Sequence, residues 1–338
     1  MNFSRFSFLR VFLSTTAFAL FFSAPGEAAT LSCLQAPTLE TVIGCIVDHM
    51  PGAASQSFVV PSSTVQSDWR KVVRSMLGGS CAHLVLPKSL RNNYVVSPFI
   101  DTRNGRSYCI LMESLDKDNN GLVDSGWGTF ITAAQSLREL NIQVPHPIAD
   151  AMTSAEGISI FTGTRARSFL MAGTHRGSDT AQSTCQTSSL RADAGHNTEP
   201  LLEPAVAEIL AFYSSNGKQW TALQFHGMSD ASCDGVDVHL TYGLTTTPLA
   251  NDKIHTLKAN LLWYNPAWKV TVPEDQPACS LNGVTNVQGR LLNNVSLTNV
   301  CTTSAMTASK RFIHIEQKDL MRDPQNWINA INDTWPAN

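Results

Sequence analysis

Long runs of lysine and arginine are missing from this sequence, and its 24 basic and 27 acidic side chains leave a net charge of −3. Nucleic-acid-binding proteins carry a basic excess that neutralises phosphates, so this composition argues against a nucleic-acid partner. No G-x-S-x-G motif occurs, which argues against an esterase with a serine nucleophile elbow. After the N-terminal segment no stretch of about 20 apolar residues follows, so we expect no membrane-spanning helix there.

The first 29 residues have the pattern of a cleaved signal peptide. Arg5 and Arg10 give a basic start, an apolar run follows over 11–22, and small residues stand at positions 26 and 28. The apolar run is too short to span a membrane. We therefore expect a secreted or periplasmic protein, cleaved near residue 28 or 29, that has no membrane association after cleavage.

No cysteine lies in a C-x-x-C arrangement, and the wide spacings argue against a cysteine zinc cluster. The eight cysteines of an exported chain are better explained as disulfides. Many pairings are possible, and the simplest joins each cysteine to its neighbour in the sequence. The expected bridges are Cys33–Cys45, Cys81–Cys109, Cys185–Cys233 and Cys279–Cys301.

The pattern of apolar residues predicts an α/β protein. Residues 30–79 form a small helical lead-in held by the first cysteine pair, and residues 80–338 form the main domain. A β-hairpin is expected over 107–132, and strands then alternate with helices, which favours a mainly parallel or mixed sheet with helices on both faces. The expected strands are 140–144, 167–173, 220–225, 236–242 and 311–315, and the expected helices are 154–161, 199–213, 253–263 and 319–331.

Ionisable residues follow four of these strands. His146 and Asp150 come after the first, His175 and Arg176 after the second and His226 after the third, and His314 and Glu316 end the last. In open α/β sheets ligands bind at the carboxyl ends of the strands, where the loops converge. A histidine at one strand end is more often a packing residue, but three at three such ends indicate a common site.

This arrangement suggests a zinc site. Catalytic zinc commonly has about three protein ligands, often two imidazoles and a carboxylate, and leaves one position open. His146, Asp150 and His226 would be these ligands. Glu316 would act as the base for the attacking water, and Arg176 would hold a substrate carboxylate.

Two rival ligand sets stay open. His196 and Glu199 have an H-x-x-E spacing at the start of an expected helix, although Glu199 could also be a first-turn residue whose charge the helix dipole stabilises. His175 could replace His146, with Asp179 as its carboxylate. Separately, 116–121 matches the start of a calcium loop, but it lacks the final glutamate and is better explained as a turn.

A family resemblance follows from the order of these residues. Pro145-His146 with Asp150 and Thr153, then a basic residue, Asp193 with His196-Asn197, His226 and Ile315-Glu316 resemble the N-formylglutamate amidohydrolase and phage poly-γ-glutamate hydrolase group, which are distant relatives of zinc carboxypeptidases. The resemblance spans roughly 126–332. It departs from the group at 147–149, where a glycine-rich stretch is usual, at Asp150, where a glutamate is usual, and at Thr198, where an arginine is common.

The resemblance implies a zinc-carboxypeptidase-like fold and a set of roles. The metal would be held by His146, Asp150 and His226, with Glu316 as the base. The residues that would bind substrate are Arg176, His175, His196 and Asn197.

The sequence therefore favours a secreted zinc hydrolase that cleaves an amide next to a free carboxylate, in a peptide, a γ-glutamyl chain or an N-acyl amino acid. The alternative is a secreted binding protein on a hydrolase-like scaffold that has no turnover. Substitution of Glu316 by glutamine distinguishes them, because only an enzyme loses turnover while it retains metal.

Overall fold

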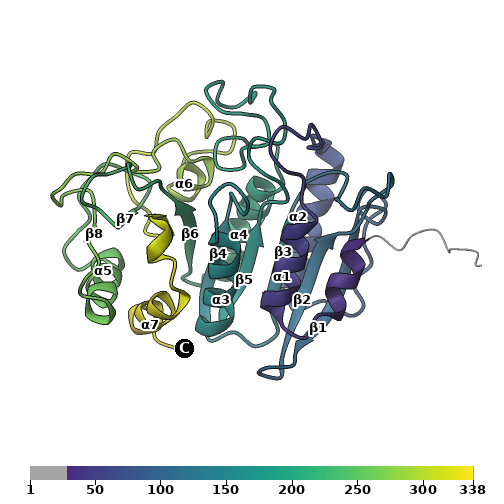
Figure 1. Ribbon diagram of the computed structural model, residues 1–338, viewed down its shortest axis with the longest axis horizontal. Helices are drawn as coiled ribbons and strands as arrows, with labels where there is room; N and C mark the ends of the chain where they lie inside the picture. Colours follow the sequence, from purple (N-terminus) through teal and green to yellow (C-terminus); the bar gives the residue numbers. More distant parts are fainter. Residues whose placement is uncertain (1–28, 338) are drawn as a thin grey trace, which may run out of the picture.

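The computed structural model describes residues 29–337 (Figure 1). The expected signal peptide therefore lies outside the described residues, apart from its last position. None of the helices within residues 29–337 combines the length and the hydrophobicity that a membrane-spanning segment needs. The helices are η1 (Ala29–Gln35), α1 (Leu39–Asp48), α2 (Ser63–Leu77), α3 (Thr153–Thr164), α4 (Leu202–Asn216), α5 (Lys253–Tyr264), α6 (Val287–Leu292), η2 (Asp319–Met321) and α7 (Pro324–Thr334). The strands are β1 (Tyr94–Asp101), β2 (Arg106–Glu113), β3 (Thr129–Ala133), β4 (Arg138–Val144), β5 (Ala166–Met171), β6 (Thr221–Gly227), β7 (Val238–Thr241), β8 (Val270–Thr271) and β9 (Phe312–Gln317).

All nine described strands form one mixed sheet, in the order β1-β2-β3-β5-β4-β6-β9-β7-β8. The centre is parallel, because β4 pairs in parallel with β5 and β6, and β6 pairs in parallel with β9. Antiparallel strands flank this centre on both sides. The four parallel strands thus bring their carboxyl ends to one edge of the sheet, which Figure 1 shows at the top, under the long loops.

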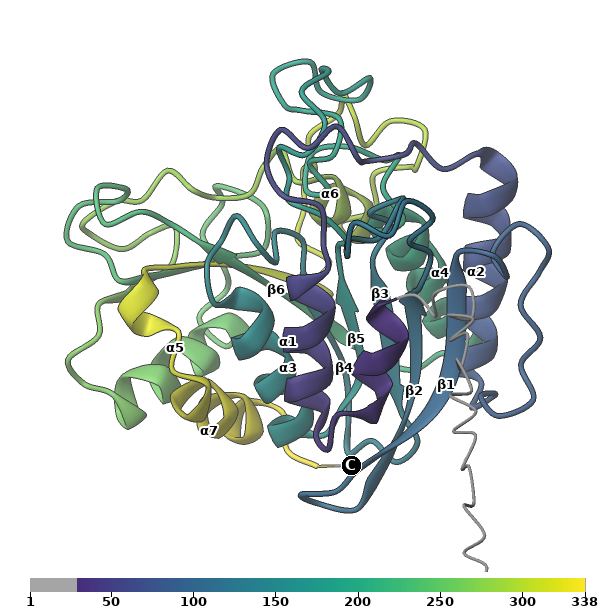
Figure 2. The same ribbon diagram turned by 45° about the vertical axis from the view of Figure 1, so that its right-hand side comes forward.

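Helices cover both faces of the sheet (Figure 2). On one face α1 packs against α3, α3 against α7 and α7 against α5, and on the other face α4 packs against α2 and α6. The apolar side chains form a separate core on each face, since successive strand residues point to opposite sides. On β5, for example, Phe169 and Met171 belong to one core and Leu170 to the other. The predicted α/β class with helices on both faces is confirmed.

The N-terminal lead-in is helical, as expected, and supplies one helix to each face. In α1 the buried residues Leu39, Val42, Ile43 and Ile46 have the spacing of an amphipathic helix. Thr38 begins this helix with a capping box shared with Thr41. The domain boundary expected near residue 79 stays a prediction.

The disulfide prediction is correct for two bridges and wrong for two. Cys33–Cys45 and Cys81–Cys109 are present, but the others are Cys185–Cys301 and Cys233–Cys279. Pairing by sequence order fails because Cys185 and Cys301 lie in two different connections, β5 to α4 and α6 to β9, that meet above the same edge of the sheet. No described cysteine is free.

Candidate metal centre and active site

A tight turn after β4 places His146 and Asp150 side by side. The amide of Asp150 donates to the carbonyl of His146 at 3.0 Å, which brings side chains four residues apart to the same side. The Thr153 hydroxyl, at the start of α3, donates to the Asp150 carbonyl at 2.7 Å and fixes the end of the turn. The neighbouring strand β6 ends at the same level and presents His226.

These three side chains meet at one oxygen atom. Nδ1 of His146 lies 3.1 Å from Oδ2 of Asp150, and Nδ1 of His226 lies 3.5 Å from the same oxygen. The backbone amide of Gly227 also donates to this oxygen, at 3.1 Å. All three side chains are buried, so the group is held within the protein below the loops.

The outer nitrogen of each imidazole faces a hydrogen-bond acceptor. Nε2 of His146 lies 2.9 Å from Oδ1 of Asp193, and Nε2 of His226 lies 2.8 Å from Oε1 of Gln224. Metal-binding histidines are typically oriented in this way, with one ring nitrogen donating to a carboxylate or carbonyl and the other directed at the metal. Both Nδ1 atoms are therefore the ligand atoms that the group offers.

The donor set fits a zinc ion. Tetrahedral zinc with bonds of about 2.0–2.1 Å separates neighbouring ligand atoms by roughly 3.3 Å. The separations at Asp150, 3.1 and 3.5 Å, lie on either side of this value. Two imidazoles and one carboxylate are also the chemistry of a catalytic zinc site that keeps a position open.

The charges of the group show how strongly its members interact. Burial lowers the pKa of His146, but Asp193 and Asp150 outweigh it and raise the pKa to about 9. Burial lowers the pKa of His226 to about 4, which Asp150 offsets only in part. Although burial alone would raise it, the pKa of Asp150 lies well below its ordinary value because of the two histidines. Beside Asp150 the surroundings thus favour a positive charge on His146 and disfavour one on His226.

Glu316 lies beside the three side chains. It is the direct neighbour of His226 across the parallel pair β6 and β9, so both side chains are on the same face of the sheet. Burial, followed by the charge of Asp150, raises the pKa of Glu316 to about 8. No hydrogen bond from a described residue reaches its carboxylate, and its side chain is 12 % exposed. Glu316 is therefore available to a proton from solvent or substrate.

His314 shares this face with Glu316. Its ring centre lies 4.4 Å from that of His226, and its Nε2 lies 3.7 Å from Oε1 of Glu316. Its Nδ1 is buried and has no hydrogen-bond partner among the described residues. Gly283, with φ of +65°, packs against this ring so closely that a Cβ atom there would lie 2.7 Å from it. His226, His314 and Glu316 are a second set close enough to hold an ion.

Three of the expected substrate-binding residues lie around this group. Nη1 of Arg176 is 4.0 Å from Oδ1 of Asp150, and its side chain is 47 % exposed. His175 accepts a hydrogen bond from the amide of Gly177 at 2.9 Å and is partly exposed. Nδ1 of His196 lies 3.2 Å from Oδ1 of Asp193, the oxygen that also faces His146. Arg176 is thus a cation at the outer side of the candidate metal centre.

Asn197 is not brought to the site. Its amide nitrogen donates to the carbonyl of Arg191 and to Glu199, its oxygen accepts from the amide of Glu199, and it is fully buried. These contacts stabilise the loop itself. Its expected role in substrate binding stays a prediction, without support from these contacts.

The rival ligand sets do not form. Among the described residues, neither His175 with Asp179 nor His196 with Glu199 belongs to a group close enough to hold an ion. Asp179 instead bonds to the Ala181 amide and to Arg191, and Glu199 to Thr184 and Asn197.

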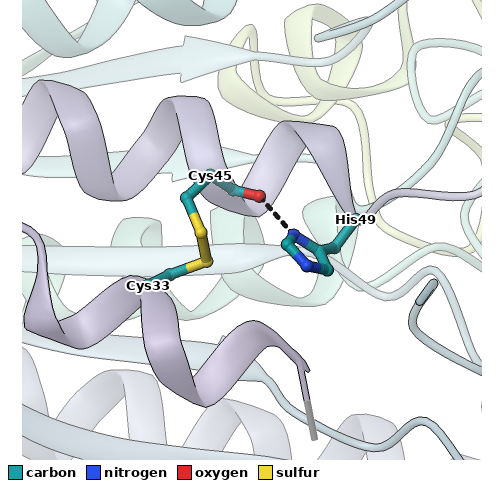
Figure 3. A group of neighbouring side chains, drawn as sticks. All are labelled: Cys33, Cys45 and His49. Atoms are coloured by element: carbon teal, nitrogen blue, oxygen red, sulfur yellow. Dashed lines mark hydrogen bonds between the residues drawn. A yellow bond between two sulfur atoms is a disulfide. The ribbon is translucent and has the colours of Figure 1, made fainter. Parts of the chain in front are cut away.

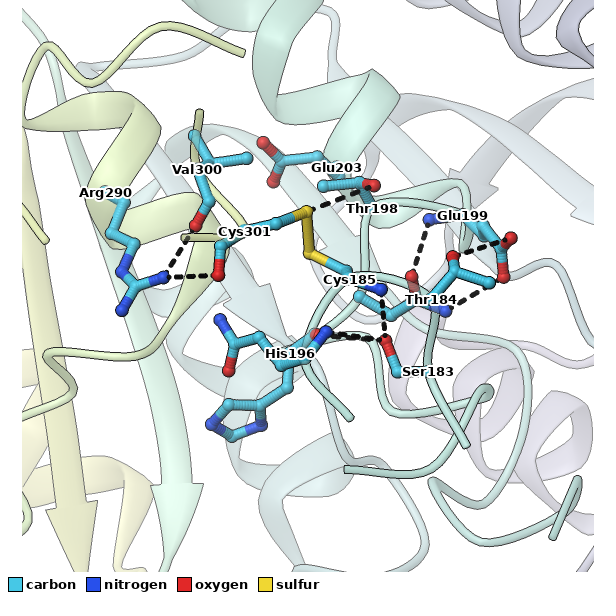
Figure 4. Close-up of a disulfide and its surroundings, with 12 residues drawn as sticks. Ser183, Thr184, Cys185, His196, Thr198, Glu199, Glu203, Arg290, Val300 and Cys301 are labelled. Atoms are coloured by element: carbon cyan, nitrogen blue, oxygen red, sulfur yellow. Dashed lines mark hydrogen bonds between the residues drawn. A yellow bond between two sulfur atoms is a disulfide. The ribbon is translucent and has the colours of Figure 1, made fainter. Parts of the chain in front are cut away.

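The loop between β5 and α4 covers the candidate site and is fastened on both sides. The Cys185–Cys301 disulfide joins it to the connection between α6 and β9 (Figure 4). Arg290 holds that connection by donating to the carbonyls of Val300 and Cys301, at 2.7 and 3.0 Å. On the other side, the amide of Ala54 donates to the carbonyl of Gly177 at 2.8 Å. The position of Asp193 therefore depends on contacts far along the chain.

Two other clusters have structural explanations. Cys33, Cys45 and His49 lie together, but both sulfurs are in a disulfide and His49 bonds to the Cys45 carbonyl at 2.7 Å (Figure 3). In the turn that starts at Asp116, the carboxylates accept backbone amides, including Gly121 to Asp116 at 3.0 Å. Neither cluster needs a metal to account for its contacts.

No role in the site was expected for Asp193, Gln224 or His314, although Asp193 belongs to the motif that carries the family resemblance and His314 to the ionisable residues at the strand ends. Gln224 and His314 each stand between apolar residues of a buried strand, an alternation that could have marked a polar patch on one face. Asp193 lies in an irregular loop, where no periodicity indicates which way a side chain points.

No protein-family model and no curated protein matches this chain. Among solved structures, it is similar to a gene product of Agrobacterium tumefaciens (TM-score 0.38, 11 % identity, 59 % of this chain and 88 % of that one). It is also similar to a bacteriophage poly-γ-glutamate hydrolase (TM-score 0.35, 12 % identity, 59 % and 86 %). A third is a protein described as a carboxypeptidase A from Shewanella denitrificans (TM-score 0.34, 12 % identity, 82 % and 70 %). Likeness at this level assigns neither a family nor an activity to the chain.

Proposed function

We propose that this protein is a secreted or periplasmic zinc-dependent hydrolase of an amide bond next to a free carboxylate. The substrate would be a peptide, a γ-glutamyl chain or an N-acyl amino acid. The observation that carries the proposal is the meeting of two imidazole Nδ1 atoms at Oδ2 of Asp150, 3.1 and 3.5 Å away, while both Nε2 atoms face acceptors.

Amide hydrolysis by this route needs a cation between the two imidazoles and Asp150. His146, Asp150 and His226 would hold zinc, which when bound polarises a carbonyl and lowers the pKa of water. Glu316 would take a proton from the attacking water and return it to the leaving nitrogen, so that one water and one amide give a carboxylic acid and an amine. Burial, followed by the charge of Asp150, raises the pKa of Glu316 above its ordinary value, which favours uptake of a proton by its carboxylate.

The preference for a carboxylate rests on Arg176. It is the cation beside Asp150 on the outer side of the site, and nearly half of its side chain is free to contact a ligand. A guanidinium can bind a carboxylate with two parallel hydrogen bonds. A substrate carboxylate held there would fix the orientation of the neighbouring amide.

Export is supported by the N-terminal pattern and by the cysteines. The described chain contains four disulfides, which persist in oxidising compartments and are rare in the cytosol.

The metal test compares zinc content of the purified protein, the His226→Ala variant and a control, His255→Ala. His255 lies on α5 and pairs with Glu274 at 3.2 Å, away from the site. We expect about one zinc per chain in the wild type and the control, and loss of it in His226→Ala. Zinc that is absent from the wild type, or unaffected by His226→Ala, would contradict the proposal.

The activity test uses N-acyl amino acids, short peptides and poly-γ-glutamate, each with its C-terminal carboxylate free or amidated. We expect turnover of free acids only, and a loss of about 10²–10⁴-fold in Glu316→Gln with zinc retained. Zinc binding without turnover of any of them, unchanged in Glu316→Gln, would favour the non-catalytic binding protein.

A further inference from the structure

A chain of buried amides lies under the candidate metal centre, on the face of the sheet covered by α4 and α6. Gln224 is at its centre and is fully buried. Its Oε1 lies 2.8 Å from Nε2 of His226 and 2.6 Å from Nδ2 of Asn286. Its Nε2 lies 2.9 Å from Oε1 of Gln143 and 3.4 Å from Oε1 of Gln288. Four hydrogen bonds thus occupy the whole amide group.

The orientation of Gln224 follows from backbone groups at two ends of this chain. Oδ1 of Asn286 accepts the backbone amide of Gly289 at 2.8 Å, and a backbone amide can only donate. The Asn286 atom that faces Gln224 is therefore its nitrogen, a donor, so the Gln224 atom there must be the oxygen.

The second end gives the same answer independently. Nε2 of Gln288 donates to the carbonyl of Ala194 at 2.9 Å, and a carbonyl can only accept. The Gln288 atom that faces Gln224 is therefore its oxygen, so the Gln224 atom there must be the nitrogen. The hydrogen-bond partners therefore assign the oxygen and the nitrogen of the Gln224 amide, whereas a solvent-exposed amide has no such partners to assign them.

This fixes the proton on His226. Because Oε1 of Gln224 can only accept, Nε2 of His226 must carry hydrogen, and the neutral ring keeps its lone pair on Nδ1. On that side Oδ2 of Asp150 is 3.5 Å away and already has hydrogen-bond partners in His146 and the Gly227 amide. The other tautomer would place two acceptors 2.8 Å apart in a buried site, where an unsatisfied polar contact is costly.

We propose that Gln224 is a positioning residue that selects the Nε2–H tautomer of His226 and so prepares its Nδ1 as a metal ligand. The side-chain amides of Asn286 and Gln288 act through Gln224. They prevent a flip of its amide group that would exchange the oxygen and the nitrogen. The part of the inference that concerns zinc rests on the proposed function, and the part that concerns the tautomer does not.

The test compares Gln224→Met, which keeps the length of the side chain and removes the acceptor, with Gln224→Glu, which keeps an oxygen toward His226. The control is Gln317→Met. Gln317 is equally buried and makes two side-chain hydrogen bonds, to Glu156 and Trp327, on the opposite face of the sheet. Two readouts are needed: zinc affinity by competition with a chromogenic chelator, and nitrogen NMR shifts of the His226 ring in metal-free protein.

We expect Gln224→Met to weaken zinc binding by about 10–100-fold and to give a mixture of His226 tautomers. Gln317→Met should stay close to the wild type in both readouts. Gln224→Glu loses the donor to Gln143 and Gln288, but its carboxylate still accepts from His226 and should keep hydrogen on Nε2 of that ring. If Gln224→Met does not fold, Gln224→Asn, whose shorter side chain withdraws the acceptor, replaces it.

An unchanged tautomer and affinity in Gln224→Met would overturn the inference, and so would an equal loss of affinity in Gln317→Met. A wild type that binds no zinc but shows the Nε2–H tautomer, with a mixture in Gln224→Met, would overturn the proposed function alone.

Discussion

Glu203 provides a specific test of the buried polar network. It is a carboxylic acid in the first turn of α4, and its side chain has one hydrogen-bond partner. Its Oε2 accepts from Nε2 of Gln288 at 2.9 Å, and its Oε1 has no hydrogen-bond partner among the described residues. Only 1 % of the residue is exposed. Burial raises the pKa of Glu203 from 4.5 to about 7.

The difference between these two pKa values sets the magnitude. It corresponds to about 3 kcal/mol between the protonated and ionised forms. The folded state binds the proton more tightly than the unfolded state does, so the stabilisation is complete below the unfolded pKa of about 4.5. It is lost as the pH rises through about 7, where the buried group must ionise.

Substitution of Glu203 by glutamine removes this titration, because it replaces the carboxyl group by an uncharged amide of the same shape. The free energy of unfolding of Glu203→Gln, relative to the wild type, should therefore rise by about 3 kcal/mol between pH 4 and pH 8. The assay is urea unfolding followed by tryptophan fluorescence, with a chelator present so that metal binding does not contribute. Thr198→Ser, a non-titrating change in the same region, gives the baseline. A difference between Glu203→Gln and the wild type that is the same at both pH values would refute the reasoning.

Two further changes test the candidate site and the loop between β5 and α4 that covers it. Asp193→Asn removes the charge that faces Nε2 of His146 and should weaken zinc binding by about tenfold or more, measured by chelator competition; equal affinity would show that Asp193 does not orient the ligand. Removal of the bridge by Cys185→Ser with Cys301→Ser opens a loop of 116 residues, and the free energy of unfolding should fall by up to about 4 kcal/mol, since Cys233–Cys279 already constrains part of it. Zinc affinity should fall as well, because Asp193 is in the released loop, whereas the same double change at Cys33 and Cys45 should leave it unaltered.

The sequence predicts much of the parallel centre because its signals are local. Apolar runs identify β4, β5, β6 and β9, and the ionisable residues that follow them identify the edge where ligands bind. His146, Asp150, His226 and Glu316 were all inferred from this positional argument, and the structure brings them together.

What the sequence does not reveal depends on contacts between distant segments. The sequence gives no signal that Cys185 pairs with Cys301 and not with Cys233, because that choice is made by where two loops meet. The strands expected from the sequence do not include β1, which contains Pro98, yet it forms as the edge of the sheet, where a missing amide is tolerated. The hydrogen bond from His226 to Gln224 joins residues two apart on one strand, but its meaning depends on Asn286 and Gln288 from α6.

The placement of α1 and α2 on opposite faces has a consequence for the order of folding. Their partners α3 and α4 begin 105 and 125 residues after α1 and α2 end, and α2 is joined to α4 by pairs such as Arg70 with Glu208, which are 138 residues apart. Contacts at such separation require closure of long loops, which slows folding. We expect both apolar cores to stay partly open until α1 and α2 dock, so that docking of these two helices is a late step that closes both faces of the sheet.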